Sequence, residues 1–359
     1  MATESDLLFL RGALALAASG RCIAPPNPSV GCLIVKAGII VGRGWTHRPG
    51  QGHAEVNALA NAGQAANGAT AYVSLEPCAF HGRTPPCSQA LIDAGIARVV
   101  AAMTDPHPQV AGQGFEDLRQ AGVAVELIEL PEAEQAIAGF VSRIRRNRPV
   151  VRLKVAASLD GRTAMASGES KWVTGAAARA DVQAWRAGSC AIITGAETVL
   201  VDDPALTVRD QSFAHDGSIR QPLRVVLDSN LRVPVSAKLF AEPGETLVVH
   251  MAGTPAHEKA EHLLLPATEG RVDLDALLTH LAERPCNEVL VEAGPTLIGA
   301  FLEAGLWDEL LLYVAPKLLG SDARPLAHLP FAHMLEAIEA KIVHRDAVGD
   351  DLRLRLVPA

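Results

Sequence analysis

The sequence lacks any long apolar run, and no stretch approaches the roughly 18 consecutive apolar residues that a membrane-spanning helix needs. It also lacks the pattern of a secretory leader, because Glu4, Asp6 and Arg11 interrupt the apolar residues near its start. Between Leu7 and Ala17 the apolar residues recur at helical spacing. We therefore expect an amphipathic first helix that packs on a sheet, and no membrane partner.

Basic residues are in the minority, with 32 lysines and arginines against 40 acidic residues, a formal net charge of −8 and a pI near 5.8. A broad nucleic-acid surface normally requires a basic face, so we expect no nucleic-acid partner. The balance still allows a small basic pocket for one phosphate. The six cysteines form no secreted disulfide framework, which makes a reducing cytoplasm the simplest location.

Aromatic residues are also scarce, at 4% of the chain, whereas 49% of its residues are hydrophobic, so the cores should rest on aliphatic packing. At 359 residues the chain exceeds the usual single-core limit of about 250–300 residues. The basic segment Arg143–Pro149 is the natural seam, and we interpret it as a charged connector rather than a nucleic-acid arm. We place the domains at residues 1–146 and 147–359.

Helix and strand signals alternate in both halves, which predicts two α/β domains, the first with a largely parallel sheet. In the first half, Val30–Lys36 and Ile39–Arg43 flank Ala37-Gly38, which indicates an antiparallel hairpin. The other elements expected in that half are helices over 53–59, 89–93 and 115–121 and strands over 71–75, 98–102 and 123–128. In the second half we expect strands over 150–156, 191–194, 223–227, 246–250, 288–292 and 309–314, and helices over 176–187, 274–282 and 295–304.

The most informative residues are His53, Glu55, Cys78 and Cys87. One imidazole and two thiolates give Zn²⁺ three protein ligands, whereas a closed structural site normally has four. An open position beside a carboxylate is what hydrolytic deamination of a heterocycle requires, because the metal activates a water and a glutamate moves the protons. We therefore expect His53, Cys78 and Cys87 to bind zinc and Glu55 to be catalytic.

A structural zinc site would need a fourth ligand, and the sequence offers Cys22, Cys32, His47 and His81. Cys32 lies in an apolar strand pattern and suits a core position, and Cys22 precedes a proline-rich loop. The catalytic interpretation is therefore favoured over the structural one.

Eight residues separate Cys78 from Cys87, whereas most nucleoside and polynucleotide deaminases use Pro-Cys-x-x-Cys. The insert suits a loop that reaches over a substrate, and its Arg83 is placed to meet a phosphate. Together with Asn27-Pro28-Ser29-Val30-Gly31, His53-Ala54-Glu55 and Glu76-Pro77-Cys78, it resembles the deaminase domain of the bifunctional riboflavin-biosynthesis deaminase/reductase family. That resemblance implies a cytidine-deaminase-like α/β/α domain.

The second half lacks the Gly-x-Gly-x-x-Gly that a nicotinamide enzyme often shows, so any dinucleotide site must use another fold. Three stretches stand out: Lys154–Arg162, Asp202–Arg209 and Glu292–Leu297. The last leaves a strand and opens a helix, which is a favourable anion site for a cofactor phosphate. Each alone is explained equally well by a turn or a helix start. In this order they resemble the reductase half of the same family, which has a dihydrofolate-reductase-like α/β fold.

The resemblance implies deamination of a diaminopyrimidinone that carries a phosphoribosylamino group, followed by reduction of its ribosyl chain to ribityl with NADPH. It also implies a homo-oligomer. The positions that match the family's NADP site are Ala156, Trp172, Thr198, Asp202, Ser229, Gly294, Pro295, Thr296, Leu297, Ile298, Gly299 and Ala300. The positions that match its sugar-phosphate site are Ser170, Arg186, Leu206, Arg209 and Glu292.

These assignments make physical sense, because Arg186 and Arg209 carry planar charged forks suited to a phosphate. Trp172 offers an apolar face to the cofactor, and Lys154 and Glu292 are candidates for positioning or proton transfer near the ribose. Two other hypotheses stay open at this point: a nucleic-acid or nucleoside deaminase with an appended binding domain, and a non-catalytic protein in which zinc only holds the first domain together.

Overall fold

The computed structural model describes residues 3–82, 84–108, 110–251, 259–268 and 270–359, and the chain falls into two compact units, Met1–Asn147 and Arg148–Ala359. The expected seam is largely helical, because Arg143, Arg145 and Arg146 occupy the last turn of α6. Basic side chains are favourable there, where the helix dipole is negative. No helix among the described residues is both long and apolar enough to cross a membrane.

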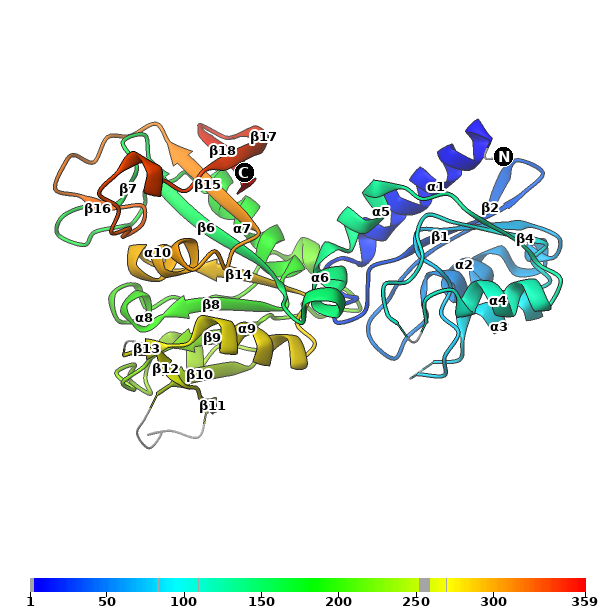
Figure 1. Ribbon diagram of the computed structural model, residues 1–359, viewed down its shortest axis with the longest axis horizontal. Coiled ribbons are helices and arrows are strands. Elements are labelled where there is room, and N and C mark those ends of the chain that lie inside the picture. The colour runs from blue at the N-terminus through cyan, green and yellow to red at the C-terminus, as the bar shows by residue number, and fades with distance from the viewer. Residues whose placement is uncertain (1–2, 83, 109, 252–258, 269) are drawn as a thin grey trace. The chain divides into compact units, whose positions relative to one another are not determined.

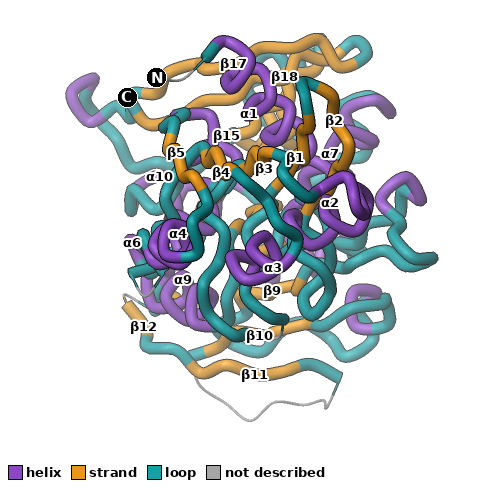
Figure 2. The backbone as a smooth tube through the Cα atoms, turned by 90° about the vertical axis from the view of Figure 1, so that its right-hand side faces the viewer, coloured by secondary structure: helices purple, strands orange, loops and turns teal. Residues whose placement is uncertain are grey.

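The first unit is built on a five-stranded sheet in the order β2-β1-β3-β4-β5, which Figure 2 shows side by side. Its strands are β1 (Gly31–Lys36), β2 (Ile39–Trp45), β3 (Thr70–Val73), β4 (Arg98–Ala101) and β5 (Ala124–Leu127). The expected hairpin is present, since β1 and β2 pair antiparallel and Ala37 and Gly38 both have positive φ. β1 is also antiparallel to β3, so only the β3-β4-β5 half of the sheet is parallel.

Helices cover both faces of this sheet. They are α1 (Glu4–Ala17), α2 (Ala54–Ala62), α3 (Cys87–Asp93), α4 (Gln113–Gln120), α5 (Pro131–Ala136) and α6 (Ala138–Arg146). A Cβ on Gly31 would meet the backbone of Ala13 in α1, whereas one on Gly44 would meet the backbone of Ala54 in α2. Neighbouring strand residues point to opposite faces, and Gly44 lies opposite Cys32, the residue after Gly31. The unit is therefore an α/β/α sandwich whose helices pack unusually close to β1 and β2.

The second unit holds a nine-stranded sheet in the order β11-β10-β9-β8-β14-β6-β15-β18-β17. Its strands are β6 (Val150–Ser158), β8 (Ala191–Gly195), β9 (Leu223–Leu227), β10 (Thr246–His250), β11 (Glu261–Leu264), β14 (Glu288–Glu292), β15 (Glu309–Ala315), β17 (Ala340–Val348) and β18 (Asp351–Pro358). All pairings from β11 to β15 are parallel, and β18 and β17 add an antiparallel edge that the sequence analysis did not anticipate. Figure 1 shows this hairpin beside β15. Three two-residue strands, β12 (Ala267–Thr268), β13 (Arg271–Val272) and β16 (Arg324–Pro325), and the short β7 (Arg162–Ala164) lie outside the large sheet.

Four helices of the second unit are α7 (Ala176–Gly188), α8 (Ala196–Asp202), α9 (Leu274–Glu283) and α10 (Pro295–Glu303). Leu277 of α9 and Phe301 of α10 share one buried cluster with Val291, whereas Val182 of α7 packs with Leu290 on the other face. Each layer therefore buries alternate residues of the same strands, as the period of two requires.

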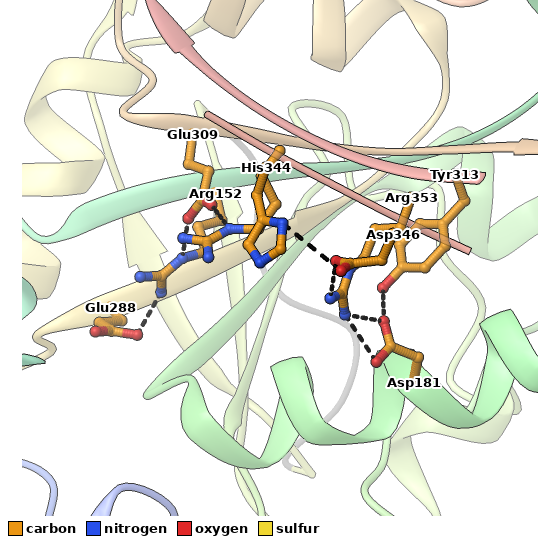
Figure 3. A network of polar contacts seen from close by, with 9 residues as sticks. Arg152, Asp181, Glu288, Glu309, Tyr313, His344, Asp346 and Arg353 are labelled. Carbon is orange, nitrogen blue, oxygen red and sulfur yellow. Dashed lines mark hydrogen bonds and ion pairs between the residues drawn. The ribbon is translucent and has the colours of Figure 1, made fainter. Parts of the chain in front are cut away.

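A polar network on the α7 face joins the strands to the C-terminal hairpin (Figure 3). Buried Arg152 lies between Glu288 and Glu309, and its Nε is 2.7 Å from the Glu309 Oε2. Farther along, the Tyr313 hydroxyl donates to Asp181 of α7 at 2.5 Å, and Arg353 of β18 donates to the same carboxylate at 2.7 Å. The network thus ties α7 to strands that are far apart in the sequence.

Candidate functional site

Three potential metal ligands converge at the helix starts of the first unit. His53 is the N-cap residue of α2, Cys87 is the first residue of α3, and Cys78 lies in the loop after β3. The His53 Nδ1 is 3.3 Å from the Cys87 Sγ and 3.6 Å from the Cys78 Sγ, and all three ligand atoms lie within 4.8 Å of one another. Residues 34 positions apart in the sequence therefore form one cluster.

This donor set fits zinc. Tetrahedral coordination with Zn–S of about 2.3 Å and Zn–N of about 2.0 Å places nitrogen and sulfur roughly 3.5 Å apart, close to the separations seen here. His53, Cys78 and Cys87 form the one such cluster found in the described part of the chain, and no fourth protein ligand joins it there. One coordination position would thus stay open to water.

The surroundings of Cys78 favour the thiolate that a metal requires. The Cys87 N–H donates to the Cys78 Sγ at 3.4 Å, and the interactions of Cys78 with Cys87 and His53 lower its pKa despite burial. Glu55 follows in the first turn of α2 and is only 3% exposed. Burial, together with the nearby Cys78 charge, raises the pKa of Glu55 to about 7. A carboxyl group with that pKa can both accept and return a proton near neutral pH.

Glu76, which precedes the Pro77-Cys78 pair, has a structural role that the sequence analysis did not assign. Its buried carboxylate accepts the N–H groups of Asp105 at 3.1 Å and of Gly112 and Gly114 at 3.0 Å each. A Cβ on Gly114 would lie 1.9 Å from the Pro77 carbonyl oxygen, so only glycine allows this approach. Glu76 thus fastens the 105–114 loop to the segment that carries Cys78.

The sequence analysis also did not assign Asp105 to the site. Its position just after the expected strand over 98–102 is a signal that could have identified it as a site residue. Carboxyl ends of parallel neighbours meet at one sheet edge, and β4 pairs with β3, which leads to Cys78. Burial, with Glu76 and Cys78 nearby, raises the pKa of Asp105 to about 6, against the hydrogen bond from the His107 N–H. Asp105 is therefore, after Glu55 and Glu76, a third buried carboxyl group near Cys78.

The other candidate ligands do not join the cluster. Cys32 is fully buried in β1, as expected for a core residue, and the Glu55 charge together with burial raises its pKa. Cys22, His47 and His81 lie outside the group of converging ligand atoms. Arg83, expected to meet a phosphate, lies outside the described residues.

In the second unit, Glu292 is the last residue of β14 and lies opposite Lys154, which is in the middle of β6. Arg186 of α7 donates to both oxygens of the Glu292 carboxylate, from Nε at 2.6 Å and from Nη2 at 2.9 Å, and its Nη1 donates to the Thr207 carbonyl at 3.1 Å. Burial works to raise the pKa of Glu292, but Arg186, Lys154 and Arg209 outweigh it and lower that pKa. Burial lowers the pKa of Lys154, against the favourable charge of Glu292.

Several positions of the expected cofactor site also lie together. The Gly294 N–H donates to the Thr198 Oγ1 at 3.2 Å, and the Ser170 hydroxyl donates to Asp202 at 2.9 Å. Ser229 follows the end of β9, whereas Ala156 lies near the end of β6. These positions all lie toward the carboxyl edge of the parallel sheet, where ligands of open α/β sheets bind.

The start of α10 fits a cofactor phosphate. Gly294 caps this nine-residue helix without any side-chain hydrogen bond, and Pro295 occupies its first turn. The first backbone N–H groups therefore stay available to an anion. Farther along, Ile298 is fully buried in the core, and a Cβ on Gly299 would meet the His328 carbonyl oxygen at 2.1 Å. Only the first residues of the expected Gly294–Ala300 segment are therefore placed to touch a ligand.

The remaining candidates differ in exposure. Trp172 is 62% exposed, and the Arg179 guanidinium stacks 4.4 Å from its ring centroid. Leu206 is buried among core residues of α7 and β14, so its side chain packs in the core next to the site. The Arg209 side chain is exposed, while its N–H donates to Gln183 at 2.7 Å.

Comparison with known proteins gives matches over both units. Residues 3–103 match the family described as the cytidine and deoxycytidylate deaminase zinc-binding region, and residues 149–352 match the RibD C-terminal domain. The riboflavin biosynthesis protein RibD of Escherichia coli is 51% identical over 99% of this chain and 100% of its own length. The protein of the same name from Haemophilus influenzae is 45% identical over 99% and 98%.

Solved structures agree over the same extent. Acinetobacter baumannii RibD, form 1, matches with a TM-score of 0.92 and 44% identity over 99% of each chain. A diaminohydroxyphosphoribosylaminopyrimidine deaminase/5-amino-6-(5-phosphoribosylamino)uracil reductase from Thermotoga maritima matches with a TM-score of 0.88 and 30% identity, again over 99% of each chain. The matches confirm the expected fold class, a cytidine-deaminase-like domain followed by a reductase domain, both α/β.

Proposed function

Because this chain belongs to the RibD family of riboflavin-biosynthesis enzymes, we propose that His53, Cys78 and Cys87 hold its zinc ion and that Glu55 moves its protons. The chain is a bifunctional enzyme. It deaminates 2,5-diamino-6-(5-phosphoribosylamino)pyrimidin-4-one with zinc and then reduces the ribosyl side chain to ribityl with NADPH. The alternative, a nucleic-acid or nucleoside deaminase with an appended binding domain, is not favoured by matches that cover both units.

One observation carries the deaminase assignment: the three ligand atoms lie within 4.8 Å of one another, beside a buried glutamate. Zinc bound there supplies a Lewis acid that lowers the pKa of a water to about 7. Glu55 accepts a proton from the attacking water and returns it to the amino group that leaves as ammonia. Burial of Glu55 excludes bulk water from this exchange and keeps its pKa near neutrality.

For the reductase, we assign the sugar-phosphate substrate to Ser170, Arg186, Leu206, Arg209 and Glu292. Glu292 accepts from Nε and Nη2 of Arg186 and the Thr207 carbonyl accepts from its Nη1, so Arg186 orients that carboxylate. The exposed Arg209 side chain is then the better phosphate ligand. Lys154 and Glu292 occupy paired positions on the neighbouring strands β6 and β14, and we assign them to face the ribose, where they can stabilise the charge that develops during reduction.

We assign NADPH to the Gly294–Ala300 helix start together with Ala156, Trp172, Thr198, Asp202 and Ser229. The uncapped N–H groups after Gly294 suit a cofactor phosphate, and the Gly294 N–H itself is held by Thr198. Hydride transfer supplied by the bound cofactor depends chiefly on alignment within about 3–3.5 Å, which these rigid strand ends favour.

A homo-oligomer is also proposed, with β17 as its contact. This edge strand is exposed along most of its length, and Ile342 and Val343 are 52% and 54% exposed. Met334 and Leu335 just before it are 89% and 100% exposed. Long apolar edges are usually covered in functional proteins. We further propose a cytoplasmic location without a nucleic-acid partner, because none of the six cysteines forms a disulfide and the net charge is −8.

The deciding experiment follows the purified, zinc-analysed protein by ultraviolet absorbance with the phosphoribosylamino-diaminopyrimidinone, with and without NADPH. Ammonia release without NADPH, and NADPH oxidation only after deamination, are the expected results. Ammonia release with no NADPH consumption would contradict the reductase assignments. Neither signal, with one equivalent of zinc bound, would contradict the site assignments in both units.

A further inference from the structure

Two cysteines that the catalytic chemistry does not use lie next to each other in the second unit. Cys190 immediately precedes β8, and its N–H donates to the carbonyl of Glu288, the first residue of the neighbouring strand β14, at 2.8 Å. Its Sγ accepts the Asn287 N–H at 3.2 Å, and that nitrogen is bonded to the carbonyl carbon of Cys286. The Cys190 sulfur therefore lies against the peptide of the second cysteine, although 96 positions (286 − 190) separate the two in the sequence.

The two thiols have unequal environments. Cys190 is half-buried, whereas Cys286 is only 5% exposed. The Arg220 guanidinium is fixed beside Cys190, because it donates to the carbonyls of Ala187 and Ser189 at 2.8 and 2.7 Å. The Cys286 thiol and the Arg220 charge lower the pKa of Cys190 despite burial, while the interaction with Cys190 raises that of Cys286. A half-buried cysteine whose pKa is lowered, beside a buried cysteine whose pKa is raised, is the arrangement of an attacking and a resolving cysteine.

The pair is separate from the reductase site. Cys190 and Cys286 precede the first residues of β8 and β14, whereas Glu292, Gly294 and Thr198 lie at or beyond the opposite ends of the same strands. Chemistry at the pair therefore leaves the substrate and cofactor residues untouched.

We propose that Cys190 and Cys286 form a peroxide-reactive thiol pair that closes an intrachain disulfide. The Cys190 thiolate attacks a hydroperoxide: an S–O bond forms, the O–O bond breaks, and hydroxide leaves. The Cys190 sulfur is oxidised by two electrons to a sulfenic acid, and the peroxide is reduced. The Cys286 sulfur then loses its proton and attacks the Cys190 sulfur, so that the S–S bond forms, the S–O bond breaks and water leaves. Overall, two thiols and one hydrogen peroxide give one disulfide and two waters.

The test exposes the zinc-loaded enzyme to a small excess of hydrogen peroxide and maps its peptides by mass spectrometry without reduction. The expected product is a linked peptide pair containing Cys190 and Cys286, lighter by two hydrogens and restored by dithiothreitol. Cys22, another half-buried cysteine of the same protein, is the internal control. Reductase activity should be retained after the disulfide has formed.

Two variants separate the roles. In Cys286→Ser, Cys190 should accumulate as a sulfenic acid that dimedone traps, and in Cys190→Ser the Cys286 thiol should stay unmodified. Absence of the linked peptides in the wild-type protein, or oxidation of Cys190 no faster than Cys22, would overturn the proposal. Oxidation of Cys286 in the Cys190→Ser variant would equally overturn the assigned order. The wild-type measurement decides the matter even if neither variant folds.

Discussion

The metal cluster of the first unit and the substrate site of the second are built in different ways. His53, Cys78 and Cys87 come from two helix starts and one loop within 35 consecutive residues. The second site collects Lys154, Arg186 and Glu292 from two strands and a helix, and an ion pair between residues 106 positions apart holds it together. The first site depends on the kinds of ligand it contains, the second on which charges are paired.

This difference predicts how each site fails. At the metal cluster, replacing Glu55 and sparing the three ligands should abolish deamination and leave the structure intact, because Glu76 rather than Glu55 holds the adjoining loop. At the substrate site, a substitution that breaks the ion pair should affect structure and activity together, because a buried charge is left without its partner.

The largest effect is expected for Glu55→Gln. Loss of the proton shuttle should reduce deamination by about 10²–10⁴-fold, since general acid–base catalysis contributes on that scale. Zinc content should be unchanged, and reduction of supplied deaminated substrate should persist. Ammonia release, metal analysis and NADPH oxidation measure the three quantities. Loss of zinc from this variant would contradict the distinction between ligand and shuttle.

Arg186→Ala should be nearly as severe in the second unit. It leaves the Glu292 carboxylate buried and unpaired, which costs about 3–5 kcal/mol of unfolding free energy, and reduction should be lost. Urea unfolding and NADPH oxidation measure these effects, and deamination should be retained.

The double variant Arg186→Leu/Glu292→Leu is the matched control for that experiment. It removes both charges, so stability should recover by most of the loss while reduction stays absent. Recovery of reduction together with stability would show that the pair serves folding only.

Glu76→Gln tests the structural support of the metal cluster separately from its ligands, because it weakens the hydrogen bonds that hold the 105–114 loop and leaves all three ligands in place. A neutral amide oxygen accepts the three N–H groups of the 105–114 loop more weakly, so the free energy of unfolding should fall by about 2 kcal/mol. The KM for deamination should rise as the loop loosens. The exposed Glu132→Gln is the control and should change neither quantity. An unchanged denaturation midpoint for Glu76→Gln would contradict the fastening role.

Arg209→Ala tests the assigned phosphate ligand. Loss of one charge-assisted contact should raise the KM for the phosphorylated substrate of reduction by roughly tenfold and leave kcat close to its original value. Deamination should not change. An equal fall of both activities without unfolding would contradict the picture of two separate sites.

The smallest effect is expected for the pH dependence of stability, through the ion pair of Asp6 and Arg98 in the first unit. Buried Asp6 accepts two hydrogen bonds from Arg98, at 2.8 and 3.1 Å, and this partner lowers the pKa of Asp6 below its usual 3.8 despite burial. Stability from this pair is fully present above pH 5 and is lost as the pH falls through 3.8 towards the depressed value. Asp6→Asn should therefore flatten the acid limb of the stability curve measured by urea unfolding between pH 3 and 6. A wild-type slope in the variant would contradict this account.

Much of the first unit was predictable because its signals are local. The positive-φ turn at Ala37-Gly38 and the helix start at His53 depend on residue types within a few positions of each other, whereas α3 begins at Cys87, two residues before the expected start. The C-terminal hairpin β17–β18 was not predicted, although Leu352, Leu354 and Leu356 alternate with Arg353 and Arg355 in β18. Its place in the sheet depends on long-range contacts such as Arg353 with Asp181, which no local pattern predicts. The loop-fastening role of Glu76 was missed for the same reason.

The sequence alone determined the chemistry of the first site, since one histidine, two cysteines and a nearby glutamate specify zinc and proton transfer by their ligand types. It also determined the alternation of helices and strands, which depends on local periodicity. Only the tertiary structure decided that Arg186 serves Glu292, that Glu76 holds the loop bearing Asp105, and that Cys190 meets Cys286. These pairings depend on which strands become neighbours, and strand order is set by packing of the whole sheet rather than by any short segment.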